Sequence, residues 1–278
     1  MSATLLGVGA LLLWAFLALL SKLAAGLPPL QLTAMSFAVA ALVGMAVIAA
    51  RGELRALRQR PLAWAHGVGG LFGYHALYFA ALAYAPAVEA NLLNYLWPLL
   101  IVLFSGPILG LRLGSRRLAG VALGFAGCAL LLGGGARFPA EAWLGFLCAV
   151  GCALVWALYS VTAKRLSAVP TEAVAGFCAG AAVLALVAHL ALEPSVAPDA
   201  RQALAALLLG LGPVGAAFFL WDVGMKRGDP PLLGTLAYAV PVASTLLLIA
   251  AGAGAFTWNL AVALALVAGG GWLAATAR

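Results

Sequence analysis

The sequence predicts an all-α integral membrane protein in which ten transmembrane helices form a 5+5 inverted-topology repeat. The first observation behind this prediction is composition. The 278 residues are 65% hydrophobic and only 8% charged, whereas a soluble protein carries about 25% charged residues. The second is a series of apolar segments that are each long enough to cross a bilayer. The third is a set of matches between the two halves of the chain.

Ten segments are long and apolar enough to span a bilayer, which takes about 20 residues of helix. We expect them at 3–21, 30–50, 62–83, 87–109, 118–134, 142–163, 171–191, 202–225, 231–251 and 257–275. The first segment lacks the basic start of a signal peptide, and nine similar segments follow it, so we interpret it as a spanning helix. The links between segments are too short to hold a separate domain.

The distribution of Lys and Arg predicts that both termini are cytoplasmic, because cytoplasmic loops of membrane proteins carry an excess of basic residues. In this orientation most of the 15 Lys and Arg residues face the cytoplasm. They are Arg51, Arg55, Arg58, Arg60, Arg112, Arg116, Arg117, Lys164, Arg165, Lys226, Arg227 and Arg278. Only Lys22, Arg137 and Arg201 remain for the opposite side.

The charged and nucleophilic residues disfavour several classes of function. The net charge of +7 is spread over short links without a basic stripe, so nucleic acid is not an expected partner. The four cysteines lie in apolar runs without a matching set of histidines, so no metal or other cofactor is expected. The absence of HExxH, GxSxG and acidic clusters disfavours an enzyme. Ion channels usually show rings of charged side chains, and this sequence shows none, which disfavours a channel.

Two pairs of segments indicate an internal repeat. WAFLALLSKL at 14–23 aligns with WALYSVTAKRL at 156–166, and NYLWP at 94–98 aligns with AYAVP at 237–241. The shared Trp, Lys, Tyr and Pro are informative, whereas matches between small apolar residues are not in so Ala- and Leu-rich a chain. The alternative is ten unrelated helices.

The links test this repeat independently, because five spans per repeat place equivalent links on opposite sides of the membrane. The basic link 51–60 corresponds to the acidic link 193–201, as an inversion requires. We therefore divide the single membrane domain into repeats 1–137 and 138–278. Inverted repeats are typical of secondary transporters, whose binding site lies near the midplane between the halves.

The first, third and sixth spans carry aromatic residues well inside the membrane. Trp14 and Trp156 are equivalent in the repeat, Tyr159 follows Trp156 by about one turn, and Tyr74 and Tyr78 share one stripe of the third span. Aromatic rings with polar tips suit a cavity for amphipathic solutes, so we expect Trp14, Tyr78, Trp156 and Tyr159 to bind substrate. The alternative is an interfacial aromatic belt.

The fourth span contains the run EANLLNYLWPLLIVLFS at 89–105. On a helix that turns about 100° per residue, Asn91, Asn94, Tyr95 and Pro98 fall within about a third of the circumference. Polar groups rarely face lipid, so this face is expected to point inward and to contribute to the binding site. The equivalent face of the ninth span carries Tyr238, Pro241 and Ser244, which we assign to the same site.

The two prolines lack the N–H group that would bond the carbonyl one turn earlier. The carbonyls of Asn94 and Ala237 are therefore expected to lose their partners, and a substrate ammonium group would satisfy them. The alternative is that Pro98 and Pro241 are tolerated kinks, with the asparagines bonding neighbouring helices, as is common in helix bundles.

Few ionisable residues lie within the spans. Glu89 and His75 are candidates for a gate or a coupling site, although Glu89 could simply reach water and His75 could be a hydrogen-bonded structural residue. Asp222 and Lys226 have the spacing of a helical ion pair.

The remaining spans suit a scaffold. The second and seventh hold almost no polar residues and are expected on the outside. The glycines of the fifth and tenth suit close helix packing, within the fold or in a dimer.

The ten spans, the inverted repeat and the run EANLLNYLWPLLIVLFS, preceded by ALYFAALAYAPA, together resemble the drug/metabolite transporter (EamA-like) superfamily. Within it, the third and fourth spans are most similar to the YddG branch of aromatic amino acid exporters of bacterial inner membranes. The resemblance implies a cavity lined by the first, third, fourth, sixth, eighth and ninth helices.

We therefore expect a secondary transporter that exports amino acids, aromatic and other large neutral ones, by alternating access. Its partners would be the small-molecule substrate and the lipid bilayer, and both a monomer and a homodimer remain open. The alternative cargo is a drug or another small metabolite. A nucleotide sugar is disfavoured because no Lys or Arg lies at midplane to bind phosphate.

Overall fold

The computed structural model describes residues 2–133, 138–252 and 256–277, and these residues contain no β-strand. The α-helices are α1 (Ala3–Trp14), α2 (Leu17–Leu23), α3 (Pro29–Ala50), α4 (Pro61–Tyr84), α5 (Ala87–Asn94), α6 (Trp97–Leu109), α7 (Ser115–Leu132), α8 (Trp143–Ala163), α9 (Val174–Leu192), α10 (Ala200–Leu211), α11 (Ala217–Arg227), α12 (Pro230–Leu236), α13 (Ala239–Ala250) and α14 (Trp258–Ala275). Short turns of other helix types lie at Leu54–Leu57, Ala140–Ala142 and Thr171–Ala173, and a π-helical turn, η4, lies at Gly212–Ala216. Of the predicted features, Arg137, Arg278 and the end of the fifth span at position 134 lie outside the described residues.

The protein is a multi-pass membrane protein. Within the described residues, nine helical segments are long and apolar enough to cross a membrane, and they coincide with all the predicted spans except the third. The third span corresponds to α4, an unbroken helix of 24 residues. It is long enough to span, but it carries two histidines and three tyrosines that lower its hydropathy.

The fourth span is not one regular helix, which corrects the angular analysis of its residues. α5 ends at Asn94 and α6 begins at Trp97. Pro98 cannot donate a hydrogen bond back along the helix, and the backbone closes the gap with a tighter bond from Leu96 N–H to the Leu93 carbonyl at 3.1 Å. Residues on the two sides of this break therefore do not share one helical phase.

The ninth span breaks at the equivalent place, between α12 and α13. Here the expectation of a carbonyl without a partner is wrong, because the N–H of Val240 bonds the Ala237 carbonyl at 3.0 Å. A turn of the tighter i→i+3 type satisfies the group that Pro241 leaves free.

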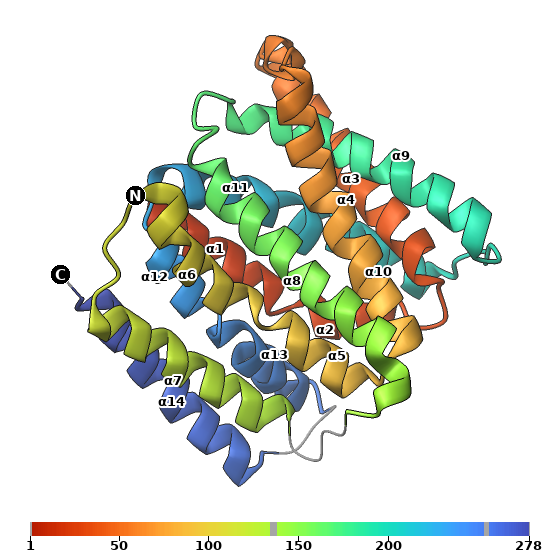
Figure 1. Cartoon of the computed structure of the whole chain (residues 1–278). Helices are drawn as coiled ribbons and strands as arrows, with labels where there is room; N and C mark the ends of the chain where they lie inside the picture. Colours follow the sequence, from red (N-terminus) through yellow and green to blue (C-terminus); the bar gives the residue numbers. More distant parts are fainter. Residues whose placement is uncertain (1, 134–137, 253–255, 278) are drawn as a thin grey trace.

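The helices pack in a few extensive pairs: α7 with α14, α3 with α9, α4 with α8, and α1 with α11. Figure 1 shows α7 and α14 lying side by side along one edge of the molecule. The glycines of this pair allow the backbones to touch, since a Cβ added to Gly120 would lie 2.6 Å from the carbonyl oxygen of Gly270. The expected close packing of the fifth and tenth spans is therefore confirmed within one chain.

Candidate functional site

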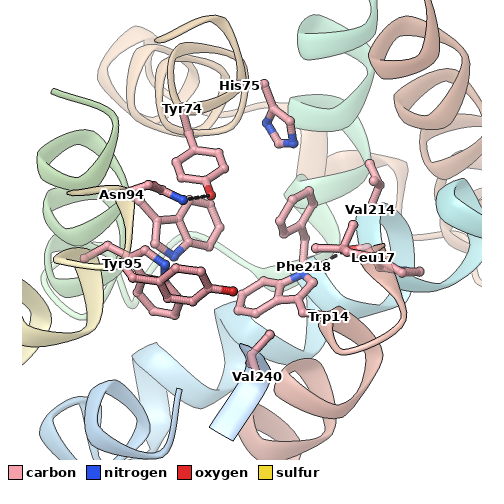
Figure 2. A pocket seen from close by; sticks show the side chains of 12 residues that line it. Trp14, Leu17, Tyr74, His75, Asn94, Tyr95, Val214, Phe218 and Val240 are labelled. Atoms are coloured by element: carbon pink, nitrogen blue, oxygen red, sulfur yellow. Dashed lines mark hydrogen bonds between the residues drawn. The ribbon is translucent and has the colours of Figure 1, made fainter. Parts of the chain in front are cut away.

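A cavity of about 90 Å³ lies where the irregular segments of the spans meet (Figure 2). Trp14 and Leu17 flank the break between α1 and α2, Asn94 and Trp97 flank the break between α5 and α6, and Val240 follows the break between α12 and α13. The π-helical turn η4 also reaches the wall. The full lining is Trp14, Leu17, Tyr74, His75, Asn94, Tyr95, Trp97, Trp156, Pro213, Val214, Phe218 and Val240.

Interrupted helices are how membrane transporters build a binding site, because irregular backbone at membrane depth is tolerated only around a cavity or inside protein. All four interruptions of the described spans contribute residues to this one cavity. The backbone and the side chains therefore indicate the same site.

Tryptophan rings form one side of the cavity. The ring of Trp14 lies 5.6 Å from that of Trp156 and 6.3 Å from that of Trp97, with edge-to-face geometry. Trp221 lies behind them, 5.0 Å from Trp14, and its indole N–H bonds the hydroxyl of Ser160 at 3.0 Å. Such packing holds the rings in place and leaves aromatic faces for a ligand.

Polar groups form a second side. The Asn94 amide nitrogen lies 3.2 Å from the hydroxyl of Tyr74, and its oxygen lies 3.3 Å from the thiol sulfur of Cys152. His75 is hydrogen-bonded to the backbone carbonyl of Leu71 at 2.7 Å. None of the cavity-lining residues is an acid, a lysine or an arginine. The site therefore offers neutral hydrogen-bonding groups and aromatic faces.

Residues 1–133 and 143–276 match the model of the EamA-like transporter family. The chain belongs to this family. It is 52% identical over 273 residues to an aromatic amino acid exporter YddG of Ancylobacter novellus, and the match covers 97% of this chain and 95% of the relative. The YddG exporter of Salmonella typhimurium is 28% identical, over 88% of this chain and 87% of its own. A probable terminal-alkyne amino-acid exporter of Streptantibioticus cattleyicolor is 25% identical, over 82% and 81%.

Among the solved structures that match, a crystal structure has a TM-score of 0.94 at 51% identity, covering 98% of this chain and 96% of that one. The family assignment, made on the sequence from its spans and fourth-helix motif, is thus confirmed. Membership of this family makes the protein a transporter.

Five residues to which the sequence analysis assigned a binding, gate or coupling role lie on the cavity of this EamA-like transporter: Trp14, His75, Asn94, Tyr95 and Trp156. Tyr74, noted in the sequence for sharing a stripe with Tyr78, also lines it. Tyr78 and Asn91 do not line it. They bond each other instead, with the phenol donating to the amide oxygen at 2.6 Å, and the Tyr78 ring stacks on Tyr74 at 6.1 Å. Their position one turn from the lining residues leaves their assignment to the substrate site a prediction.

Tyr238 is fully buried away from the cavity, in a separate core cluster with Val102 and Val121. Its ring lies 6.1 Å from that of Phe125, and its hydroxyl accepts a hydrogen bond from the backbone N–H of Leu99. The ninth span reaches the cavity through Val240 instead.

Pro98 and Pro241 are buried in protein and do not face lipid, but neither lines the cavity. Pro98 lies at the crossing of α6 with α12, where a Cβ added to Gly234 would be 2.9 Å from its carbonyl oxygen. The carbonyl of Pro241 accepts from the Thr245 hydroxyl at 2.8 Å. Ser244 is half-buried outside the cavity.

A second, smaller hollow contains Tyr159 together with His66 and an ion pair. Asp222 and Lys226 lie 2.8 Å apart and are buried, which confirms the predicted helical pair. The Lys226 ammonium also donates to the Val169 carbonyl, and the Thr171 hydroxyl donates to the Asp222 carboxylate. These hydrogen bonds connect α11 with the link between α8 and α9.

Glu89 lies in the first turn of α5 and is only 5% exposed. The expectation that it reaches water is therefore wrong: its side chain is buried in the protein, although Val88 beside it is 46% exposed. It does not line the cavity, so its role as a gate or coupling site stays a prediction.

The sequence reasoning missed several lining residues, notably Trp97, Phe218 and the pair Pro213–Val214. Trp97 falls outside the polar arc of a regular helix, and it lines the cavity directly after the break between α5 and α6. For Phe218 and the pair Pro213–Val214, the sequence did contain a clue: a proline within a long apolar span. Proline interrupts helical hydrogen bonding, and Pro213 lies in the π-helical turn.

Proposed function

We propose that this protein is a secondary transporter that exports aromatic and other large neutral amino acids from the cytoplasm across the bacterial inner membrane by alternating access. The observation that carries this proposal is the cavity itself, in which tryptophan, tyrosine and phenylalanine rings surround a few neutral polar groups. Large apolar side chains fit against such rings. The relatives named as aromatic amino acid exporters support the same substrate class.

The proposed architecture has ten spans, with α4 as the third, in inverted repeats 1–137 and 138–278. The helix packing supports it. When each helix of a contacting pair is replaced by its counterpart in the other repeat, the resulting two helices are also in contact. The contact of α4 with α8 becomes that of α11 with α1, while α3–α9 and α7–α14 map onto themselves. The two stretches matched by the family model, 1–133 and 143–276, fall on either side of the proposed boundary.

The proposed orientation places both termini in the cytoplasm. Its support is that segments assigned to the cytoplasmic side meet at one end of the molecule. Arg117 pairs with Asp229 at 2.7 Å, Lys164 donates to the Gly228 carbonyl, and the Asp229 N–H donates to the Thr4 hydroxyl. The positive-inside rule then decides which side that end faces.

Counterflow in reconstituted vesicles tests the function. Vesicles preloaded with unlabelled phenylalanine should accumulate labelled phenylalanine, tyrosine, tryptophan, leucine and methionine, whereas labelled glutamate and lysine should stay near the level of protein-free vesicles. Absence of flux for every neutral amino acid, together with flux of an organic cation, would instead support the drug-exporter alternative.

A further inference from the structure

The wall of the cavity formed by Asn94 and Tyr74 is a pair of hydrogen-bond donors. The amide nitrogen of Asn94 donates one of its two N–H groups to the Tyr74 hydroxyl. The hydroxyl accepts this bond, so its own proton is still available to donate. Within the described part of the chain, neither the second N–H nor the phenol proton has a recorded acceptor. Figure 2 shows the two side chains together on one side of the cavity.

Cys152 sets the direction of that amide. Its sulfur lies 3.3 Å from the Asn94 amide oxygen and 3.3 Å from the Tyr74 carbonyl oxygen. The thiol has one proton for these two oxygens. When the proton goes to the amide oxygen, it favours the orientation in which that oxygen faces the sulfur and the amide nitrogen faces Tyr74 and the cavity.

His75 supplies the opposite kind of group. Its Nδ1 lies 2.7 Å from the Leu71 carbonyl, which can only accept, so in the neutral imidazole the proton is on Nδ1 and Nε2 carries a lone pair. Among the described residues Nε2 has no recorded hydrogen bond. The rings of Phe37 and Phe218 lie 5.1 Å and 6.5 Å from the imidazole, and Figure 2 shows it pointing into the space between Tyr74 and Phe218.

We propose that the cavity binds the head group of its substrate as an intact zwitterion, using neutral groups alone. The carboxylate accepts hydrogen bonds from Asn94 and Tyr74, and the ammonium group donates to Nε2 of His75. The side chain lies on the tryptophan rings, and Cys152 is a positioning residue. This inference rests on the proposed function and names the substrate's charged groups that the site reads.

The physical reason is charge balance. A zwitterion has no net charge, so a site without lysine, arginine or acids among its lining residues can hold it. A ligand with only one of the two charged groups brings an unpaired charge into an apolar enclosure, which is costly, and leaves one set of protein groups without partners. The site therefore rejects both the amine and the acid that correspond to a given amino acid.

Competition in counterflow tests this. Vesicles exchange labelled phenylalanine, and the competitors are unlabelled phenylalanine, 2-phenylethylamine, which lacks the carboxylate, and 3-phenylpropionate, which lacks the ammonium group. For the wild-type chain we expect each analogue to need a concentration at least about tenfold higher than phenylalanine for half-inhibition, the factor expected for a lost hydrogen bond to a charged group.

His75→Phe keeps an aromatic ring against Phe37 and Phe218 but removes the acceptor. Phenylalanine should then bind about tenfold more weakly while 3-phenylpropionate is unchanged, so that the preference between them disappears. His75→Gln retains an acceptor oxygen and should restore part of that preference. His66→Gln is the matched control, since His66 lies outside the cavity and bonds Thr162.

Cys152→Ala removes the group that orients Asn94 and should reduce the preference for phenylalanine over 2-phenylethylamine, whereas Cys152→Ser should retain it. Cys128→Ala, at a buried cysteine of α7 away from the cavity, is the control. Equal inhibition of the wild type by all three compounds, or an equal loss for all three in His75→Phe, overturns the inference. A wild-type chain that exchanges no amino acid contradicts the proposed function instead, which is a separate result.

Discussion

The indole Nε1 of Trp14 donates a hydrogen bond to the carbonyl oxygen of Pro213 at 2.9 Å. Trp14 ends α1 just before the chain breaks, and Pro213 lies in the π-helical turn between α10 and α11. The bond therefore joins two interruptions that lie on the same cavity. The segments on either side are also paired, α1 with α11 and α2 with α10.

Removing this bond should weaken the fold. Trp14→Phe keeps an aromatic ring in the cluster but leaves a buried carbonyl without its donor, which we expect to lower the free energy of unfolding by about 1–3 kcal/mol. Thermal unfolding in detergent measures it. Trp272→Phe, at a residue that is 67% exposed, should leave the midpoint unchanged, and equal midpoints for both variants would contradict the prediction.

The buried pair Asp222–Lys226 should matter far more than the partly exposed pair Arg117–Asp229. Asp222→Asn leaves a buried ammonium group without its counter-charge, at an expected loss of about 3–5 kcal/mol. The double variant that combines Asp222→Leu with Lys226→Met removes both charges together, so no buried charge is left unpaired and much of the stability should be recovered.

Arg117→Gln is the comparison for that experiment. Its side chain and that of Asp229 are 21% and 33% exposed, so water screens the pair and the expected loss is about 0–1 kcal/mol. A chemical-denaturation series in detergent compares these variants with the wild type. Similar losses for Asp222→Asn and Arg117→Gln would show that burial does not govern these pairs.

Substitution by alanine should disrupt the packing at one of two adjacent glycines of α14 and have no effect at the other. A Cβ added to Gly270 would collide with the carbonyl oxygen of Gly120, so Gly270→Ala must separate α7 from α14. Gly269 has no neighbouring atom within 4 Å of such a Cβ. We expect Gly270→Ala to lose the monodisperse peak in size-exclusion chromatography and Gly269→Ala to retain it.

Asn94→Ala and Tyr238→Ala should separate transport from stability. Asn94 lines the cavity, so its truncation should lower amino acid exchange at least about tenfold with the protein still folded. Tyr238 fills a closed core cluster, and its truncation should lower the free energy of unfolding by about 3–5 kcal/mol. Counterflow and thermal unfolding on the same preparations distinguish the two outcomes.

The orientation can be tested with single introduced cysteines. Arg58→Cys, in an exposed link, should react with a membrane-impermeant maleimide only from the cytoplasmic side, and Trp258→Cys, at a position 80% exposed, only from outside. The wild-type chain, whose cysteines are buried or half-buried, gives the background. The reverse labelling pattern would invert the topology.

The sequence alone was sufficient for features that depend on local composition. Length and hydropathy act on each segment separately, so the apolar spans and the family motif of the fourth helix could be recognised without coordinates. Asn94 was found because a polar side chain inside a span rarely faces lipid, and Trp14 and Trp156 were found because they align with each other across the two halves of the chain.

Only the tertiary structure decided which of these residues share the cavity. Helical periodicity relates two residues only while the helix is regular, and the breaks before Trp97 and around Pro213 change the phase of the residues beyond them. Tyr95 and Tyr238 align with each other in the proposed repeat. Tyr95 nevertheless lines the cavity, while the ring of Tyr238 lies against Gly124, where an added Cβ would leave the ring no room. The helix that packs against each tyrosine decides this difference, and the sequence of the tyrosine's own span does not reveal that helix.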